Sequence, residues 1–181
     1  MLSELQQRKL TRLFNLYDQQ TNGVLTQADF ERITDNLAAI RGWTPGSPYY
    51  DNLLAIYMRI WNGVQKFTDQ NQDQQVTLDE WLTYHENVLS DTDGNEAVVN
   101  AKAAGIIFLL DSDKDDKVTL EEYRQFFQAY GIDDSQIEEI FGRFDQNNDG
   151  YIDKQEILDL VTEFYYSQDP EAPGNWIFGS Y

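Results

Sequence analysis

Residues Asp145–Glu156 read DQNNDGYIDKQE, a segment in which polar oxygens recur at regular positions. Oxygen-bearing side chains occupy its first, third, fifth and twelfth positions: Asp145, Asn147, Asp149 and Glu156. Gly150 at the sixth position can adopt the positive φ of a sharp turn, and Tyr151 at the seventh can add its backbone carbonyl. Calcium takes about six to eight oxygen ligands in a flexible shell, so this spacing predicts a loop that surrounds a hard cation.

Three further segments repeat this order, and each lies between helix-like apolar patterns. They are Asp18–Asp29 (DQQTNGVLTQAD), Asp69–Glu80 (DQNQDQQVTLDE) and Asp111–Glu122 (DSDKDDKVTLEE). Apolar residues around them recur with the spacing of one helix face, as in the set Leu10, Leu13, Phe14 and Tyr17. A helix, a calcium loop and a second helix make up the EF-hand unit. We therefore expect an all-α fold with four such units and eight helices.

The eighth position of each loop predicts how the units pair. It is apolar in all four loops: Leu25, Val76, Val118 and Ile152. Such residues suit a short antiparallel strand, so we expect Leu25 beside Val76 and Val118 beside Ile152. The turn-rich connector Ser90–Glu96 separates the pairs. This predicts EF-hand pairs at residues 1–92 and 93–181, with short β-bridges, packed as one compact globule.

The third loop has the most acidic set of predicted ligands. They are the side chains of Asp111, Asp113, Asp115 and Glu122 and the carbonyl of Lys117. Asp116 replaces glycine at the sixth position, where a left-handed backbone costs an L-residue about 1 kcal/mol. Four carboxylates should outweigh this strain. We expect the third loop to bind Ca²⁺, as the fourth loop does.

The second loop offers a similar set with two departures. Its predicted ligands are Asp69, Asn71, Asp73, the carbonyl of Gln75, and Glu80. Gln74 occupies the turn position, and Gln65 and Thr68 stand where apolar residues usually precede such a loop. We expect metal binding here, and we expect the entering helix to bend or to shift its register.

The first loop has only two charged residues in ligand positions, Asp18 and Asp29. Gln20, Asn22 and Thr26 complete the expected order. Asp29 at the twelfth position is one methylene shorter than glutamate, so it reaches a metal less easily and favours fewer oxygens, as in a Mg²⁺ site. A metal site and a purely structural loop both remain open for Asp18–Asp29.

The twelfth-position carboxylates have an alternative explanation as helix caps. The ninth residue of each loop is Thr or Asp, and the carboxylate three residues later completes the spacing of a capping box. One loop alone could be explained in this way. Four loops that also match at positions one, three, five and eight favour cation binding.

Composition limits the possible functions further. The formal net charge is −19 with no basic stripe and no cysteine, which argues against nucleic-acid binding and disulfides. The N-terminal MLSELQQRKLTRLF is not a signal peptide, and no apolar run approaches membrane-spanning length, so we expect a cytoplasmic protein and a monomer. No catalytic motif stands out, which indicates that the protein is not an enzyme.

Four units of unequal spacing, aromatic helices and a tail past the last unit resemble the sarcoplasmic calcium-binding protein family, including its bacterial relative calerythrin. The tail Ser167–Gly179 (SQDPEAPGNWIFG) is similar to the endings of such proteins. The resemblance covers nearly the whole chain. It implies two EF-hand pairs packed face to face, and cytosolic Ca²⁺/Mg²⁺ buffering or signal modulation without enzymatic activity. It also implies that one unit is often degenerate, and Asp18–Asp29 is the candidate here.

Two other functions stay open. A calcium sensor exposes a methionine-rich groove to a partner protein, whereas this chain has only Met1 and Met58, which favours a buffer. A photoprotein-like binder of a small molecule would need an enclosed, polar-lined cavity, which the abundant Trp and Tyr residues could surround. Aromatic residues at helical spacing are more often core, and the sole histidine, His85, is more simply a generic surface or core residue.

The final segment Asp169–Tyr181 carries more apolar bulk than a free tail usually does. We expect Trp176, Ile177 and Phe178 to dock onto the globule. In that position they would cover a groove that a sensor would use for its target.

Overall fold

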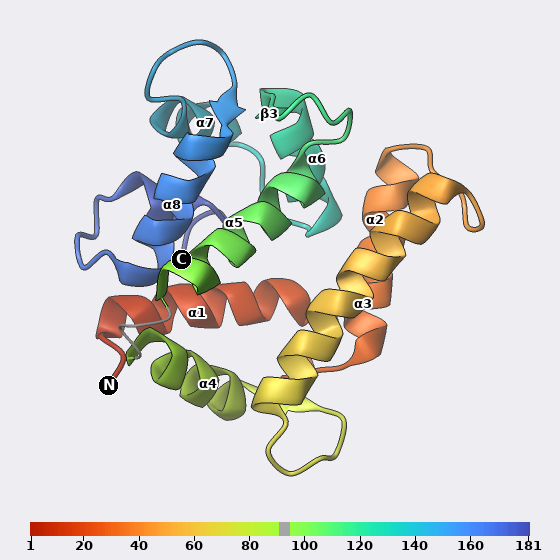
Figure 1. Ribbon diagram of the computed structural model, residues 1–181, viewed down its shortest axis with the longest axis vertical. Helices are drawn as coiled ribbons and strands as arrows, with labels where there is room; N and C mark the ends of the chain where they lie inside the picture. Colours follow the sequence, from red (N-terminus) through yellow and green to blue (C-terminus); the bar gives the residue numbers. More distant parts are fainter. Residues whose placement is uncertain (91–94) are drawn as a thin grey trace.

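The structure is a computed structural model that describes residues 1–90 and 95–181 (Figure 1). In these residues the chain forms eight α-helices: α1 Glu4–Tyr17, α2 Gln27–Ile40, α3 Pro48–Thr68, α4 Leu78–Ser90, α5 Asn95–Leu110, α6 Leu120–Ala129, α7 Ile137–Phe144 and α8 Lys154–Tyr166. Four two-residue strands separate helix pairs: β1 Val24–Leu25, β2 Val76–Thr77, β3 Lys117–Val118 and β4 Ile152–Asp153. A 3₁₀ helix, η1, spans Pro173–Trp176. The predicted all-α fold of four helix–loop–helix units is confirmed.

Local sequence signals explain where these helices begin and end. Ser3 and Gln6 form a capping box at the start of α1, and Pro48 follows the N-cap Ser47 at the start of α3. The helix α2 ends before Gly42, which adopts a φ of 69°. The amide of Trp43 then donates to the carbonyl of Ala38, as in a glycine-terminated helix end.

The strands pair as the apolar eighth positions predict. Leu25 lies opposite Val76 in the first antiparallel pair, and Val118 lies opposite Ile152 in the second. All four side chains are buried. Each short pair therefore ties two loops together and places them side by side at one end of their unit.

The helix before the second loop keeps its register, so the predicted shift is wrong. Leu53, Tyr57, Trp61 and Thr68 form its buried positions at regular spacing, while Phe67 points outward and is 59% exposed. Thr68 tolerates the buried position because its hydroxyl donates to the carbonyl of Val64 at 2.7 Å. A polar residue can thus fill a core position when the helix itself satisfies its hydrogen bond.

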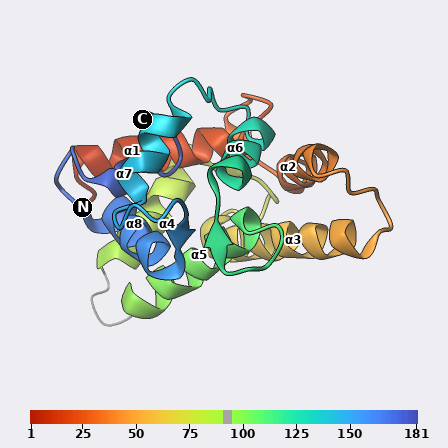
Figure 2. The same cartoon turned by 90° about the horizontal axis from the view of Figure 1, so that it is seen from above.

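The two halves of the chain share one hydrophobic core (Figures 1 and 2). The helix α2 packs against α6, and α1 packs against α8. A hydrogen bond joins the buried hydroxyls of Tyr57 and Tyr130 at 3.0 Å. The guanidinium of Arg41 donates to the carbonyls of Leu109 and Leu110 at the end of α5, at 2.9 and 3.1 Å. The predicted boundary at 92/93 and most of the predicted connector Ser90–Glu96 lie outside the described residues.

The C-terminal segment docks onto the globule, as predicted. Ile177 and Phe178 are buried, and Trp176 packs against the core in a partly buried position. The amine of Lys9 donates to Asn175 Oδ1 at 2.7 Å, and the hydroxyl of Tyr123 donates to the carbonyl of Ile177 at 2.8 Å. The N-terminal helix and the tail are therefore held against each other. Among the described residues, no helix is both long and apolar enough to cross a membrane.

Candidate metal centres

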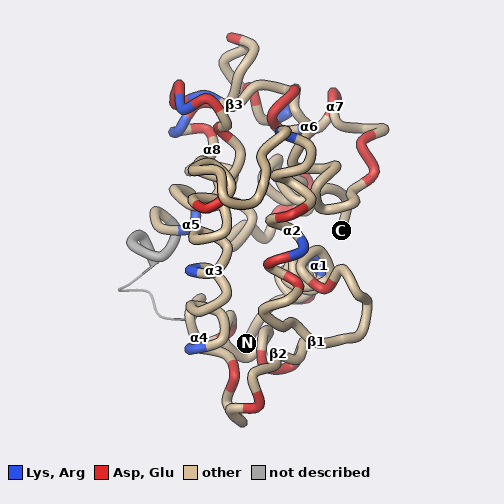
Figure 3. Tube along the Cα trace, turned by 90° about the vertical axis from the view of Figure 1, so that its right-hand side faces the viewer, with Lys and Arg blue, Asp and Glu red and all other residues tan. Residues whose placement is uncertain are grey.

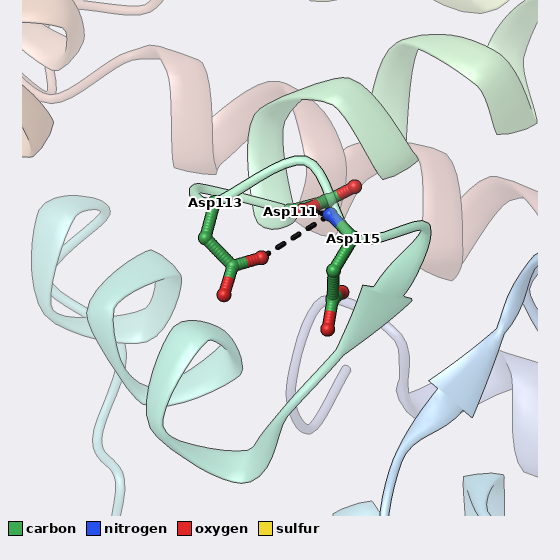
Figure 4. Close-up of side chains that lie close together, drawn as sticks. All are labelled: Asp111, Asp113 and Asp115. Carbon is green, nitrogen blue, oxygen red and sulfur yellow. Dashed lines mark hydrogen bonds between the residues drawn. The ribbon is translucent and has the colours of Figure 1, made fainter.

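The third loop brings three carboxylates together between α5 and β3. Asp111, Asp113 and Asp115 each offer an oxygen, and these oxygens all lie within 4.8 Å of one another (Figure 4). The amide of Asp115 also donates to Asp113 Oδ1 at 3.2 Å. Asp111 is buried at the end of α5, while the other two are exposed. Three like charges at this spacing repel each other strongly unless a cation lies among them.

The first aspartate of every loop organises the backbone in the same way. Asp145 accepts hydrogen bonds from the amides of Asp149 and Gly150 at 3.0 and 2.9 Å. Asp111 does so from Asp115 and Asp116 at 3.2 and 3.1 Å. The same two bonds form in the other loops, at Asp18 and Asp69. Each of the four segments therefore curves around its own centre, whatever residues it carries at other positions.

Positive φ angles explain this curvature. The sixth residue of each loop lies in the left-handed region, as predicted, including the non-glycine residues Gln74 (64°) and Asp116 (65°). The fourth residue does so as well: Thr21, Gln72, Lys114 and Asn148, with φ between 52° and 64°. Sequence reasoning missed this second left-handed position. Only Asn148 carries a residue type that favours it, so the sequence holds little signal for it.

Glu122 at the twelfth position crosses the third loop. Its Oε1 accepts from the amide of Ser112 at 2.8 Å, and its Oε2 accepts from the amide of Thr119 at 2.9 Å. Burial disfavours the ionised carboxylate, but the hydrogen bonds from Thr119 and Ser112 outweigh it, so the pKa of Glu122 lies below its ordinary value. Glu80 and Glu156 make the corresponding bonds in their loops. The capping-box prediction is confirmed, and the same carboxylate also lies across its loop.

The first loop differs at this point. Asp29 accepts from the amide and hydroxyl of Thr26 at 2.9 and 2.8 Å, so it also caps its helix. Its second oxygen accepts from the side chain of Gln20 at 3.3 Å rather than from a backbone amide across the loop. Asp29 is fully buried. The shorter side chain therefore leaves the carboxylate at the helix end, and a neutral amide occupies the third position of the loop.

The second loop keeps its geometry despite Gln74. The side-chain Nδ2 of Asn71 donates to Asp73 Oδ2 at 3.0 Å, so the third and fifth side chains of the loop lie next to each other. Glu80 accepts from the amides of Gln70 and Thr77 at 3.3 and 2.9 Å. The loop is more exposed than the third, since Asn71, Asp73 and Gln75 all lie at the surface. The predicted ligands are thus grouped as the spacing requires.

Charge is concentrated where the loops lie. Figure 3 shows acidic residues gathered near β2 at one end of the molecule and near β3 and α7 at the other. Partial loss of hydration, and then the negative charges of Asp115 and Glu122, raise the pKa of Asp113. Lys117 lies over the ring of Tyr151, 3.7 Å from its centroid, and so links the third and fourth loops. The arrangement favours a divalent cation because it would remove this repulsion.

Comparisons with known proteins agree with this geometry. The family model for an EF-hand domain pair matches residues 102–162. Calerythrin from Saccharopolyspora erythraea is 22% identical over 172 residues, which cover 93% of this chain and 96% of calerythrin. The beta chain of the sarcoplasmic calcium-binding protein from Penaeus sp. is 26% identical and covers 91% of this chain and 90% of its own length.

A solved structure of coelenterazine-binding protein from Renilla muelleri, in its calcium-loaded apo form, superposes with a TM-score of 0.81. The two sequences are 20% identical, and the match covers 99% of this chain and all of that protein. This similarity shows the fold and carries no statement about ligands.

Proposed function

We propose that this chain, an EF-hand protein that resembles calerythrin and the sarcoplasmic calcium-binding proteins, binds Ca²⁺ in three loops and acts as a cytoplasmic Ca²⁺/Mg²⁺ buffer. The observation that carries this proposal is the cluster of three carboxylates at Asp111, Asp113 and Asp115. Hard oxygen donors in a flexible loop suit Ca²⁺ better than a softer transition metal. Similarity to calerythrin and to a sarcoplasmic calcium-binding protein supports the same cation.

The proposed ligands follow the loop positions. They are Asp69, Asn71, Asp73, Gln75 and Glu80 in the second loop, Asp111, Asp113, Asp115, Lys117 and Glu122 in the third, and Asp145, Asn147, Asp149, Tyr151 and Glu156 in the fourth, with Gln75, Lys117 and Tyr151 acting through their carbonyls. Each bound Ca²⁺ would neutralise two of the negative charges in its loop. Dissociation constants on the order of 10⁻⁸–10⁻⁶ M fit such acidic loops.

The first loop is proposed to be structural. Asp29 accepts from the side chain of Gln20, whereas Glu122 accepts from a backbone amide across its loop. Asp29 is also too short to reach the far side of the loop as Glu122 does. Three bound Ca²⁺ per chain, rather than four, is therefore the expected stoichiometry.

Calorimetric titration of the metal-free protein tests the ligand assignment. Glu122→Gln removes one proposed ligand charge and should reduce the stoichiometry from three Ca²⁺ to two. Glu121→Gln is the matched control, because it removes the same charge from an adjacent side chain that is 72% exposed. Glu156→Gln should remove the fourth site in the same way. Three tight sites in the Glu122→Gln protein would refute the assignment.

The packing of the halves supports a buffer rather than a sensor. The helices α2 and α6 pack together across the middle of the molecule, and the tail covers apolar residues of α8. A sensor would have to separate such contacts when Ca²⁺ replaces Mg²⁺. Hydrogen exchange of α2 and α6 should therefore be the same with either cation. A large Ca²⁺-dependent loss of protection in these helices would favour the sensor.

A further inference from the structure

A half-open pocket of about 430 Å³ is lined by residues that lie outside the metal loops. Residues of α3, α4 and α5 line it together with residues of α1, and these helices can be followed in Figure 1. Residues of α6, α8 and the tail complete its wall. This volume falls within the roughly 300–1,000 Å³ of ordinary small-molecule sites.

Two glycines in helix interiors help to create this space. Gly63 of α3 and Gly105 of α5 both line the cavity, and a Cβ atom added to either would meet nothing within 4 Å. Glycine inside a helix costs stability relative to alanine because it loses more backbone freedom on folding. Packing within the protein therefore does not require glycine at either position. A guest that occupies the space would explain both glycines.

The wall favours an aromatic guest. Aromatic side chains line it from six different parts of the fold, among them Tyr17, Phe67, Trp81, Tyr130, Tyr165 and Phe178. Rings attract one another in stacked and edge-on arrangements beyond the effect of burial alone. The helix α5 has apolar residues on every side, including the side that faces the cavity. A flat, ring-bearing molecule would bury this surface better than water does.

The charges at the cavity are all positive. Lys102 and Arg59 are its charged lining residues, and no Asp or Glu lines it within the described part of the chain. The amine of Lys102 donates to the hydroxyl of Tyr165 at 3.1 Å, which leaves further N–H donors free for a guest. In a chain with 32 acidic residues, a cavity without a carboxylate is selective for an acidic group.

His85 adds an unsatisfied acceptor to the same wall. Its Nδ1 lies 2.8 Å from the carbonyl of Trp81, so Nδ1 carries the proton and Nε2 is the acceptor. The Nε2 atom is buried and has no hydrogen-bond partner among the described residues. Buried acceptors without a donor are rare and unfavourable. The wall is therefore polar at a few points and apolar elsewhere, as small-molecule sites generally are.

We propose that this cavity is a binding site for an aromatic organic molecule with one acidic group, such as a phenol or a carboxylate. The rings lie between α3 and α5, in the space beside Gly63 and Gly105. The acidic group lies near Lys102. This inference does not rest on the proposed metal sites, because it uses none of their residues.

Anilinonaphthalene sulfonate, a fluorescent aromatic anion, is a suitable probe of the full-length, Ca²⁺-saturated protein. It should bind with a stoichiometry near one. Gly105→Leu fills the cavity and should abolish this binding while leaving the melting temperature unchanged or higher. Gly142→Leu is the matched control, because Gly142 also lies within a helix with open space around it but at the exposed surface. Unchanged dye binding in the Gly105→Leu protein would overturn the proposal.

The acidic group is tested separately with Lys102→Met. A hydrogen bond to a charged group contributes enough that affinity for the anionic dye should fall roughly tenfold or more. Affinity for the uncharged dye Nile red should hardly change. Equal losses for both dyes would contradict the role of Lys102, and tighter binding of oleate than of the aromatic anion would contradict the preference for rings. Calcium stoichiometry of the Gly105→Leu protein distinguishes this inference from the proposed function, because it should stay the same.

Discussion

At the scale of single residues, the twelfth carboxylate has two tasks in the second, third and fourth loops. Glu122 accepts from the amide of Thr119, the N-cap residue of α6, and also from Ser112 on the opposite side of the loop. Replacing glutamate by aspartate, as at position 29, keeps the first task and loses the second. One methylene therefore separates a carboxylate that accepts from a backbone amide across its loop from one that does not.

Lys9 is a second residue whose environment has a measurable consequence. It is fully buried, and its amine donates to Asn175 Oδ1 at 2.7 Å and to the carbonyl of Glu163 at 3.2 Å. Burial lowers the pKa of Lys9 to about 8, although the negative charge of Glu163 opposes this shift. The folded protein therefore releases this proton at a lower pH than the unfolded chain, whose lysine has a pKa of 10.5.

This difference predicts how stability changes with pH. Between pH 8 and 10.5 the unfolded chain binds more protons at this lysine, so its contribution to the free energy of unfolding rises with pH, by at most about 1.4 kcal/mol per pH unit. Lys9→Met should remove this rise. Denaturant unfolding of both proteins across this range measures the difference, in which the shared ionisation of tyrosines cancels. Parallel curves for the two proteins would contradict the prediction.

At the scale of elements, the docked tail contributes side chains to the hydrophobic core. Ile177 and Phe178 bury apolar surface against α6 and α8, and the ring of Phe178 lies edge-on to Phe164 with centroids 4.9 Å apart. Gly174 approaches α8 so closely that an added Cβ would collide with the backbone of Leu160. The tail thus behaves as a structural element of the core.

Truncation of the tail should therefore destabilise the protein. Deleting residues 170–181 loses burial worth about 1.5–3 kcal/mol for each large apolar side chain and leaves Lys9 without Asn175. In a chain of this size, about 1 kcal/mol lowers the melting temperature by about 2–4 °C. Differential scanning calorimetry should show a drop of several degrees. Deleting only residues 180–181 is the control, and equal melting temperatures for the two truncations would show that the docked part contributes nothing.

At the scale of the whole molecule, repulsion between negative charges opposes the compact fold. A net charge of −19 is carried by a single globule whose acidic loops gather at two ends. Such self-repulsion opposes the compact state, while the shared core and contacts such as Tyr57 to Tyr130 hold the halves together. Bound cations would shift this balance toward the folded state.

Removal of metal should therefore lower the stability of the entire chain. A chelator should reduce the melting temperature substantially, and added Ca²⁺ should restore it with a dependence on the free concentration, since ligands that bind only the folded state stabilise it. Thermal unfolding followed by circular dichroism, at a series of free Ca²⁺ concentrations, measures this effect. A melting temperature that is independent of Ca²⁺ would contradict the proposed binding.

The sequence by itself determined the local features of this protein. The order of oxygens, the turn at the sixth position, the apolar eighth position and the caps are all short-range patterns, so they predicted the four units and the pairings of Leu25 with Val76 and Val118 with Ile152. The sequence did not predict two features of the backbone and its local hydrogen bonding. Thr68 kept its buried place through a bond to its own helix, and residues such as Lys114 adopted positive φ without a glycine.

Only the tertiary structure decided how the units enclose the cavity and which polar groups face it. His85 of α4 lies far along the chain from Lys102 and Gly105 of α5, and these helices carry no distinctive motif. They line one pocket because α3, α4 and α5 border a common space. The sequence specifies which face of each helix is apolar. It does not specify how far apart two apolar faces come to rest, because that distance results from all the packing contacts of the molecule at once.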